Sequence, residues 1–396
     1  MVSGCRRARL GELVAFKTGK LDSNAAVPNG EYPFFTCSQE TLRTNTYSFD
    51  TECVLLAGNN ANGIYPLKYF NGKFDAYQRT YVVTTRDPQV LTARFLYYAL
   101  RPKLSQFRSV STGAATKFLT LTILNETEIE VPPLPAQRRI AGILSAYDEL
   151  IENNQRRIKI LEEMARSLYR EWFVYFRFPG HDKVKRVPSS LGPIHQGWEV
   201  KKLGDLISYN RCATKPGPHL DERRYVPIDC LPSKSLALLE AKPIEEAQSS
   251  LQLFEKGDIL FGAMRPYFHK VVVAPFAGVT RTTCFVFKAM HQEWHAFATM
   301  TAFEESTVAY ANAHSQGATI PYAVWDGSLA DKPLVLPPDA LLRRFEKAVA
   351  PLLAMISQSF FVLTNLRRTR DLLLPRLLSG HIEIQDVDSQ VDKGQH

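Results

Sequence analysis

Apolar side chains recur at alternating steps of four and three residues between positions 140 and 172 of the chain. The positions of this seam are Ile140, Leu144, Tyr147, Ile151, Asn154, Ile158, Leu161, Ala165, Leu168 and Trp172. A period of 3.5 residues sustained over more than four heptads predicts a long helix that packs against another helix as a coiled coil. Asn154 is the polar member of the seam, where such a residue costs stability but can fix the register.

The same seam returns 205 residues later in the chain. Its positions are Phe345, Val349, Leu352, Ile356, Ser359, Leu363, Leu366, Arg370, Leu373 and Leu377. Ser359 falls where Asn154 stood, and Arg370, at the position of Ala165, is the one poor match. The shared register makes each copy the natural partner of the other, so we expect an antiparallel coiled coil. The alternative is a pair of unrelated amphipathic helices, each packed on its own domain.

Two prolines fall inside the second helical pattern. Pro351 removes a backbone hydrogen bond and is expected to kink or break the helix near residues 347–350. The pattern therefore predicts a short helix over Asp339–Ala350 and a long one over Leu352–Leu374, which Pro375 ends or bends.

Short matches outside the seam recur in the same order in both halves, which identifies a tandem duplication. The pairs are Pro132-Pro133 with Pro337-Pro338, Arg138-Arg139 with Arg343-Arg344, GAATKF at Gly113 with GATIPY at Gly317, and Leu10-Gly11-Glu12-Leu13 with Leu203-Gly204-Asp205-Leu206. The offset drifts from 193 at the first anchor to 205 at the last, so the two halves differ by loop insertions between the anchors.

The regions before each long helix contain short β-rich runs separated by turn residues. The clearest runs are CVLLAG (53–58), TYVVTT (80–85), DILFGAM (258–264), KVVVAPF (270–276) and TCFVFKA (283–289). Each region also contains one expected helix, at 91–107 and at 294–313. The fold class is therefore α+β, with two strand-rich domains and two long helices in a pseudo-two-fold tandem repeat.

The predicted boundaries follow from these patterns. They are a first domain at 1–133, a first spacer helix at 134–178, a linker at 179–197, a second domain at 198–336, a second spacer helix at 337–380 and a polar, mobile tail at 381–396. The helix from Ile140 to Trp172 would span about 50 Å at the usual rise, so the repeated helix would act as a ruler between two similar heads.

Composition narrows the functional class only a little. The chain has 396 residues, a formal net charge of +8 and 45% hydrophobic residues, which suits two globular domains and is compatible with a polyanion partner. The six cysteines form no CxxC pair, which argues against a zinc ribbon or disulfide framework and suits a reducing cytoplasm. No signal-peptide pattern and no 18-residue apolar run is evident, so we expect a cytoplasmic protein without a membrane span.

Motifs of the main catalytic classes are not found in the sequence. It contains no GxxxxGK[ST], no GxGxxG after a strand, no [DN]PP[FYW] methyltransferase tetrad, no HExxH and no convincing nuclease carboxylate–lysine cluster. His291 and His295 stand four residues apart, but no third metal ligand is near them in the sequence, and a solvated first helical turn is the preferred interpretation. The prediction is a protein with no catalytic residues and no metal of its own.

Residues in the turn-rich segments are candidates for nucleic-acid contacts. Asn59, Asn60 and Asn62 could present amides to adenine edges, and Tyr267 and Tyr322 could stack or bind phosphate. The basic candidates for guanine or phosphate are Arg79, Lys117, Arg265 and Arg281. For each residue taken alone, a turn-forming or surface role is the competing interpretation.

Three segments together give the chain a family resemblance. They are the run PPLPAQRRIAGILSAYDELIENNQRRIKILEEMARSLYREWF, the segment GWEVKKLGDLI at 197–207 and the ending LLPRLLSGHIEI at 373–384. With GAATKFLTL at 113–121, these motifs resemble specificity subunits of type I restriction–modification enzymes. The second helix departs from the family pattern, since ALLRRFEKAVAPLL lacks the EQ pair often seen after the prolines.

The resemblance implies a non-catalytic subunit with two target-recognition domains, each reading one half of a bipartite, asymmetric DNA site. The central helices would set the spacer and dock two modification (methyltransferase) subunits, and motor-nuclease restriction subunits would complete the complex. S-adenosylmethionine, ATP and Mg would belong to those partners, so this chain would carry no cofactor. Half-sites about 34–36 Å apart, one helical turn of DNA, are within reach of such a ruler.

Two functions of other classes compete with DNA reading. One is a coiled-coil scaffold whose heads bind proteins rather than DNA, which salt-dependent duplex binding would exclude. The other is a stand-alone metal-dependent nuclease, which an assay of the pure chain with magnesium would detect.

Overall fold

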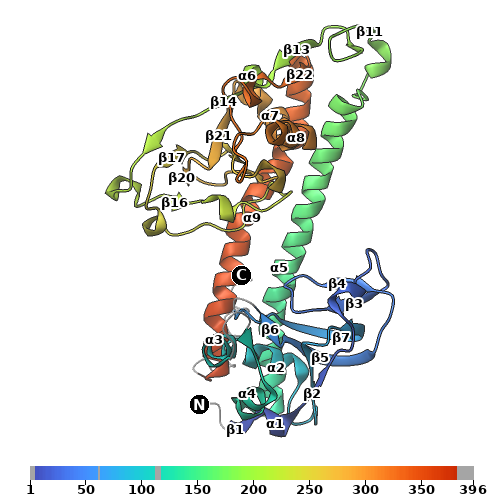
Figure 1. The fold of residues 1–396 in the computed structure, drawn as a ribbon, viewed down its shortest axis with the longest axis vertical. Coiled ribbons are helices and arrows are strands. Elements are labelled where there is room, and N and C mark those ends of the chain that lie inside the picture. Colours follow the sequence, from blue (N-terminus) through green and yellow to red (C-terminus); the bar gives the residue numbers. More distant parts are fainter. Residues whose placement is uncertain (1–4, 61–62, 112–116, 381–396) are drawn as a thin grey trace, which may run out of the picture. The chain divides into compact units, whose positions relative to one another are not determined.

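The computed structural model describes residues 5–60, 63–111 and 117–380, so the predicted mobile tail at 381–396 lies outside the described residues. The chain divides into two compact units, here called unit 1 (Met1–Glu149 with Arg367–His396) and unit 2 (Leu150–Leu366). Two long helices, α5 (Leu134–Tyr169) and α9 (Asp339–Leu378), each contribute to both units. Both units combine strands and helices, which confirms the α+β class (Figure 1).

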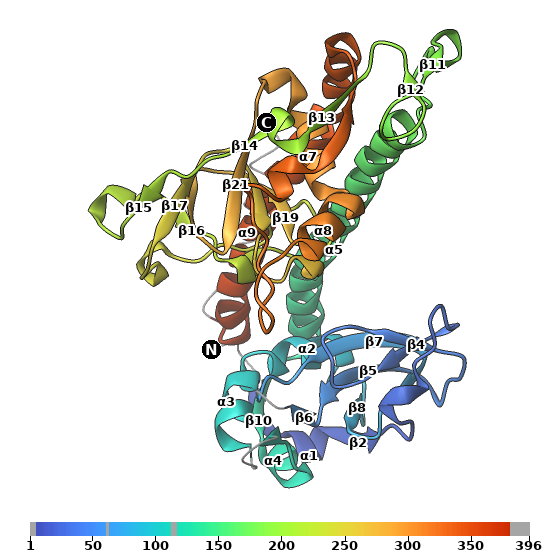
Figure 2. The same ribbon diagram turned by 45° about the horizontal axis from the view of Figure 1, so that its top comes forward.

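Unit 1 is built on a six-stranded sheet in the order β2-β8-β5-β7-β3-β4. Its strands are β1 (Arg6–Arg9), β2 (Val14–Thr18), β3 (Tyr32–Phe35), β4 (Leu42–Thr44), β5 (Phe49–Ala57), β6 (Asn59–Asn60), β7 (Leu67–Ala76), β8 (Thr80–Thr85), β9 (Lys117–Phe118) and β10 (Glu128–Val131). Its shorter helices are α1 (Leu10–Leu13), α2 (Ala93–Leu100), α3 (Lys103–Val110) and α4 (Leu121–Glu126). α2 packs on the sheet at β5 and β7 (Figure 2).

Unit 2 holds two four-stranded sheets, in the orders β14-β21-β18-β19 and β15-β17-β20-β16. Its strands are β11 (Arg186–Val187), β12 (Ile194–His195), β13 (Glu199–Lys202), β14 (Ile207–Tyr209), β15 (Ala213–Thr214), β16 (Arg224–Tyr225), β17 (Leu251–Phe254), β18 (Ile259–Gly262), β19 (Val271–Val273), β20 (Gly278–Arg281), β21 (Cys284–Ala289) and β22 (Pro333–Leu336). Its shorter helices are α6 (Leu203–Leu206), α7 (His295–Phe303) and α8 (Glu305–Ala313). All five β-rich runs read from the sequence overlap observed strands, which confirms them.

The duplication is visible in backbone pairing as well as in sequence. The strand order β2-β8-β5-β7 of unit 1 is repeated in unit 2 as β14-β21-β18-β19. The strand before each long helix pairs antiparallel with the strand that opens its copy of the repeat: β10 with β1, and β22 with β13. The sequence repeat therefore corresponds to a repeated structural unit, and its insertions account for the additional strands.

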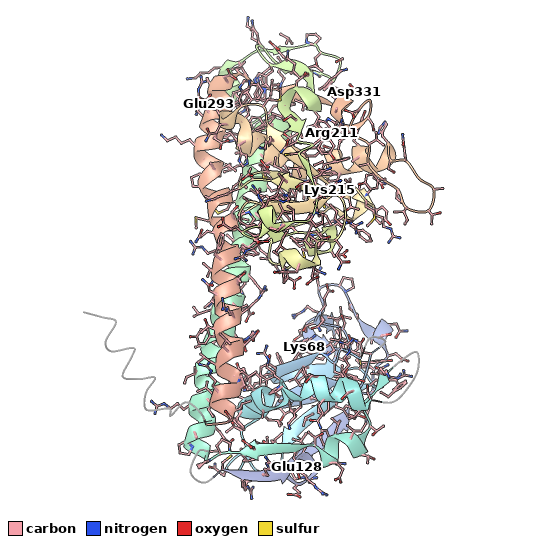
Figure 3. The ribbon with its side chains drawn as sticks, turned by 90° about the vertical axis from the view of Figure 1, so that its left-hand side faces the viewer. Lys68, Glu128, Arg211, Lys215, Glu293 and Asp331 are labelled. Atoms are coloured by element: carbon pink, nitrogen blue, oxygen red, sulfur yellow. The ribbon has the colours of Figure 1, made fainter. Side chains whose placement is uncertain are left out.

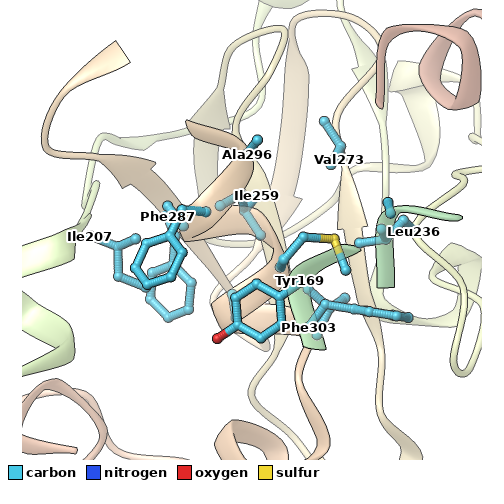
Figure 4. Close-up of a cluster of buried hydrophobic side chains, with 14 of the residues drawn as sticks. Tyr169, Ile207, Leu236, Ile259, Val273, Phe287, Ala296 and Phe303 are labelled. Carbon is cyan, nitrogen blue, oxygen red and sulfur yellow. The ribbon is translucent and has the colours of Figure 1, made fainter. Parts of the chain in front are cut away.

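The core of unit 2 joins its sheet, its helices and both long helices. Tyr169 of α5, Phe287 and Phe303 are members of this cluster (Figure 4). Seam residues of α5 and α9, including Ile158 and Ile356, are buried in the same cluster. Within unit 2 the two helices run side by side (Figures 1 and 3).

The start of α9 is fastened to the turn before α7 by polar contacts. Glu293, labelled in Figure 3, forms an ion pair with Arg343 at 3.3 Å. The carboxylate of Glu346 accepts the backbone N–H of Ala296 at 2.6 Å, which satisfies a donor in the first turn of α7. Burial raises the pKa of Glu346.

The expected break at Pro351 is wrong, because α9 continues without interruption from Asp339 to Leu378. Pro351 is exposed, so the missing hydrogen bond lies on the solvent side of the helix. Val349 and Leu353 on either side of it are buried. Burial of such side chains gives about 1.5–3 kcal/mol each, which offsets a proline cost of about 3 kcal/mol. Pro375 likewise lies within the last turn of α9 rather than ending it at Leu374.

The two helices predicted at 91–107 and 294–313 are each divided in the structure. α2 ends before Pro102 and α3 begins at Lys103, so the first prediction missed a proline boundary. α7 and α8 are separated by Glu304, whose backbone is extended (φ −64°, ψ 140°). The Glu304 carboxylate pairs with Arg170 at 2.9 Å, which stabilises the corner.

The connection between α5 and the second domain is folded and belongs to unit 2. A π-helical turn at Arg170–Val174 ends α5, and β11 and β12 then form a hairpin. His195 is buried against the rings of Phe178 and Trp198, with ring centroids 4.8 and 5.7 Å away. The segment 179–197, predicted as a linker, thus contains a small packed structure of its own.

One described helix, α9, is long and apolar enough by length and composition to cross a membrane, with a mean hydropathy of 1.6 in the relevant window. The expectation that no membrane-length apolar run exists therefore fails by this measure. The core helix of a soluble protein passes the same test, and Val349, Ile356 and Leu363 of this stretch are buried in the core of unit 2.

Candidate nucleic-acid interface

A short strand pair in unit 1 brings together candidate residues that are far apart in the sequence. β6 pairs antiparallel with β9, so that Asn59 lies opposite Phe118 and Asn60 lies opposite Lys117. The backbone N–H of Gly58 donates to the carbonyl of Arg79 at 2.8 Å. A side chain at Gly58 would come within 2.7 Å of that carbonyl oxygen, so this approach requires glycine. Four of the predicted contact residues thus share one site.

The site is hollowed into a shallow pocket of about 230 Å³. Its lining consists of Thr18, Gly58, Asn59, Gln78, Arg79, Tyr81, Phe118 and Leu119. The thiol of Cys37 donates to Oδ1 of Asn59 at 3.1 Å, which orients the amide. The phenol of Tyr81 donates to the carbonyl of Leu119 at 2.8 Å and fixes one wall, and burial raises its pKa.

Arginine and an aromatic ring lie together at the mouth of this pocket. The guanidinium of Arg79 lies 5.9 Å from the ring centroid of Phe118, and both side chains are exposed. Arginine that stacks on an aromatic ring can contact phosphate or a guanine edge, and the ring offers a stacking surface to a base. Asn62, the remaining candidate of this segment, lies outside the described residues.

Unit 2 repeats this bridge at the equivalent place. The N–H of Leu119 donates to the carbonyl of Gly58 at 2.9 Å in unit 1, and the N–H of Ala323 donates to the carbonyl of Ala263 at 2.8 Å in unit 2. Met264 pairs with Tyr322, the position equivalent to Phe118 in the repeat. The described end of GAATKF, Lys117-Phe118, and the equivalent end of GATIPY, Pro321-Tyr322, therefore have one structural role, which is to close a loop against the edge of each unit.

The loop that this bridge holds in unit 2 carries the other candidates. Arg265 precedes a 3-10 turn at Pro266–Phe268, and its N–H donates to the carbonyl of Pro321 at 2.7 Å. Tyr267, in that turn, is exposed. Arg281, at the end of β20, is also exposed.

The hydroxyl of Tyr322 has a structural partner. It donates to the carbonyl of Thr282, and burial raises the pKa of this phenol to about 12. Its role as a phosphate contact stays a prediction, and the bond shows that it also ties the loop to the end of β20. Phe118, Phe268 and Ile320 are exposed apolar side chains at the two sites that sequence reasoning did not single out. The alignment of GAATKF with GATIPY was the signal that could have identified Phe118.

Most of the predicted seam residues are buried. Those with at most 9% exposure are Ile140, Leu144, Ile151, Ile158, Leu161, Phe345, Val349, Ile356, Ser359, Leu363 and Leu377, and those of intermediate exposure are Tyr147, Asn154, Leu168, Trp172, Leu352, Leu366 and Leu373. The side chains of Asn154 and Ser359 each donate to the carbonyl four residues earlier in their own helix, at 2.8 Å. A polar contact between the helices lies elsewhere in the seam: Arg370 pairs with Asp148 of α5 at 2.6 Å within unit 1.

The ion pair explains why Arg370 interrupts the apolar pattern. Asp148 also accepts the hydroxyl of Tyr98 at 2.7 Å, and Arg101 lies 3.6 Å from it. Arg370 binds Asp371 as well, at 2.9 Å. This network connects α5, α9 and α2, so a charged side chain is accommodated in the seam.

The histidine pair at the start of α7 is engaged in structural contacts. His295 Nε2 lies 2.7 Å from the carbonyl of Gly257, and the His291 ring packs on Trp294 with centroids 4.3 Å apart. Among the described residues, no group of three or more His, Cys, Asp or Glu side chains could hold a metal ion.

Comparison with known proteins places these features in context. A family model described as "Type I restriction modification DNA specificity domain" matches residues 4–163. The type I restriction enzyme EcoDI specificity subunit of Escherichia coli is 27% identical over 298 residues, which cover 69% of this chain and 65% of that protein. The MjaIX specificity subunit of Methanocaldococcus jannaschii is 27% identical over 315 residues, covering 75% of this chain and 71% of that protein. The chain thus spans about two thirds of these relatives.

A solved structure agrees with the fold. The S subunit of the type I restriction–modification system from M. genitalium matches with a TM-score of 0.63 and 18% sequence identity, covering 94% of this chain and 96% of that chain. At this identity the match concerns the fold: two strand-rich parts and two long helices.

Proposed function

We propose that the chain is a specificity subunit of a type I restriction–modification enzyme and that it reads DNA sequence for such a complex. The observation that carries the proposal is the repeated bridge, which gives each unit a loop with arginine and aromatic side chains at an equivalent place. Two equivalent reading surfaces on one chain fit a recognition site made of two separate parts, each read by one unit.

The residues at the two loops suit different parts of DNA recognition. In unit 1, the amides of Asn59 and Asn60 can pair with adenine edges, and Arg79 and Lys117 can bind phosphate or guanine. In unit 2, Arg265 and the other loop residues combine positive charge with aromatic surface. Because these side chains differ between the units, the two half-sites are expected to differ in sequence.

The long helices are the proposed docking surface for two modification subunits, with motor-nuclease restriction subunits completing the assembly. α5 exposes three large apolar side chains within unit 2: Leu150, Ile160 and Met164. Exposed apolar surface on a helix is typical of protein interfaces. This chain would supply no catalytic group, so S-adenosylmethionine, ATP and Mg would be bound by the partner subunits. The assembled complex would act in the cytoplasm, where the DNA lies.

Binding to duplex DNA as a function of salt tests the proposal. The complex of this chain with its modification subunits should bind DNA with an affinity that falls steeply as the salt concentration rises, because each contact with a phosphate releases counterions from the DNA. Arg79→Ala and Arg265→Ala should each reduce the slope by about one. Modification subunits without this chain serve as the control. Salt-independent binding, or equal binding without the chain, would favour the protein-binding scaffold.

A further inference from the structure

Two adjacent aromatic side chains project from unit 2 into solvent. Tyr267 is 50% exposed and Phe268 is 43% exposed, and their ring centroids lie 4.7 Å apart. Aromatic surface exposed to this extent is unfavourable in water, so it favours contact with an apolar partner. Ile320, on the neighbouring GATIPY segment, is 46% exposed. The three side chains form what is here called the apolar tip, made of Tyr267, Phe268 and Ile320.

The backbone that carries the aromatic pair is strained on both sides. Arg265 and His269 have positive φ values of 51° and 52°, a conformation that is strained for residues other than glycine. His269 is buried, and its Nε2 donates to the carbonyl of Phe303 at 2.8 Å. The N–H of Lys234 donates to the carbonyl of His269 at 2.8 Å. The turn is thus held in one shape by buried anchors.

The second segment of the tip is shaped by Gly317, whose φ is 95°. A Cβ at this position would lie 2.6 Å from the carbonyl oxygen of Ile320, so the close turn requires glycine. The N–H of Arg265 donates to the carbonyl of Pro321, which ties the two segments together. The apolar tip is therefore a preformed projection from two segments.

The charges around the tip are mainly positive. Arg265 flanks the aromatic pair directly, and Arg281 adjoins Thr282, which accepts the hydroxyl of Tyr322. Lys234 and the acidic Glu305 both act electrostatically on His269. An apolar projection beside guanidinium groups suits duplex DNA, because phosphates surround the base steps that an apolar side chain can enter.

We propose that Tyr267 and Phe268 form a wedge that unstacks one base step in the half-site read by unit 2. The inference rests on the proposed function and specifies how that site engages DNA. Insertion of apolar side chains between bases kinks a duplex and makes binding depend on how easily the sequence deforms. The wedge would therefore contribute selectivity for a flexible step, in addition to hydrogen bonds to base edges.

Unit 1 differs at the equivalent place, so the distortion should be one-sided. There the bridge presents Asn59 and Asn60 with a single ring, Phe118, over which Arg79 lies. Among the residues of that bridge that the structure describes, no two adjacent aromatic side chains occur. The half-site read by unit 1 is thus expected to stay stacked.

The test uses the complex with modification subunits and a duplex that contains the gapped recognition motif, which is first identified by locating N6-methyladenine in host DNA. 2-Aminopurine, whose fluorescence rises on unstacking, is placed in turn at each position of both half-sites except the methylated adenines. We expect a rise at one step of one half-site. The double variant Tyr267→Ala/Phe268→Ala should lose that rise and bind about 5- to 150-fold more weakly. Tyr175→Ala is the matched control, since Tyr175 is also a 50% exposed tyrosine of unit 2. This variant should retain both the fluorescence rise and the binding affinity.

Three results would overturn the wedge. If the double variant keeps the fluorescence rise, another group unstacks the step, although sequence reading still stands. If the double variant fails to assemble with modification subunits in the absence of DNA, the tip is a protein contact. If the unaltered complex does not prefer the motif over random duplex, the proposed function itself fails, and the wedge fails with it.

Discussion

Glu162 fastens the body of unit 2 to α5, and its replacement gives a sharp test of the packing described above. The side chain is 6% exposed. One carboxylate oxygen accepts the hydroxyl of Ser235 at 2.7 Å and the backbone N–H groups of Leu236 and Ala237 at 2.8 and 3.1 Å. Leu236 and Ala237 are fully buried, so water cannot replace the lost acceptor.

The expected cost follows mainly from the N–H of Leu236, because the N–H of Ala237 keeps a second acceptor, Ser235 Oγ, at 3.3 Å. A buried N–H without a partner costs about 1–3 kcal/mol and a lost hydroxyl bond about 0.5–1.5 kcal/mol, so Glu162→Ala should lower the free energy of unfolding of unit 2 by about 2–4 kcal/mol. Glu162→Gln keeps an acceptor oxygen and loses only the charge, so a cost of about 1 kcal/mol is expected. Glu163→Ala, at the exposed neighbouring position, is the control, with a change within about 0.5 kcal/mol.

Urea unfolding followed by tryptophan fluorescence measures this effect selectively. All four tryptophans of the chain lie in unit 2, at positions 172, 198, 294 and 325. The unfolding midpoint should decrease in the order wild type, Glu162→Gln, Glu162→Ala. Equal midpoints for Glu162→Ala and Glu163→Ala would refute the role assigned to this carboxylate.

Other perturbations have equally specific outcomes. Asp148→Leu and Arg370→Ala should each destabilise unit 1 by about 2–4 kcal/mol, and the double variant should be destabilised by less than the sum of the two. A double-mutant cycle, with unfolding followed by circular dichroism, measures the difference. Strictly additive effects would contradict the ion pair. Burial lowers the pKa of His269, so just below pH 6.5 the unfolded chain binds a proton at this residue and the folded chain does not; unit 2 should therefore lose stability as pH falls below that value. In unfolding followed by tryptophan fluorescence, His269→Gln should make this loss of stability less steep. An equally steep loss in the variant would exclude His269 as its source. Arg79→Ala should weaken DNA binding and reduce the slope of log affinity against log salt concentration by about one, whereas Phe118→Ala should weaken binding without changing that slope. Fluorescence anisotropy measures both variants. Identical slopes for the two would count against the assigned contacts.

The architecture could be predicted because a duplicated sequence repeats its physical constraints. The heptad period identified both long helices, and the β-rich runs fell on strands of equivalent order in the two units. The prediction of a helix break at Pro351 was wrong because it rested on local backbone chemistry alone. The burial of Val349 and Leu353, which stabilises the helix there, depends on tertiary packing. Arg370 looked like a mismatch because its partner Asp148 lies 222 residues away in the chain.

The sequence indicated which polar residues of the turns are candidate contacts, but not which of them lie together in the folded protein. Asn59, Arg79 and Lys117 were chosen as polar residues in turns, and the pairing of β6 with β9 that joins them is non-local. Phe268 was not among the predicted contact residues; it is 43% exposed and lies between Arg265 and His269, both of which have positive φ. Backbone conformations of this kind have no clear signal in sequence when the residue is not glycine.

Methylation mapping of host DNA tests the central claim most directly. The modification subunits are expressed with and without this chain, and N6-methyladenine is located across the genome. The account predicts methylation on a motif of two short, different blocks separated by several unread base pairs, and its disappearance when the chain is absent. Methylation that persists without the chain, or that falls on one continuous palindrome, would contradict the assignment of sequence reading to these two units.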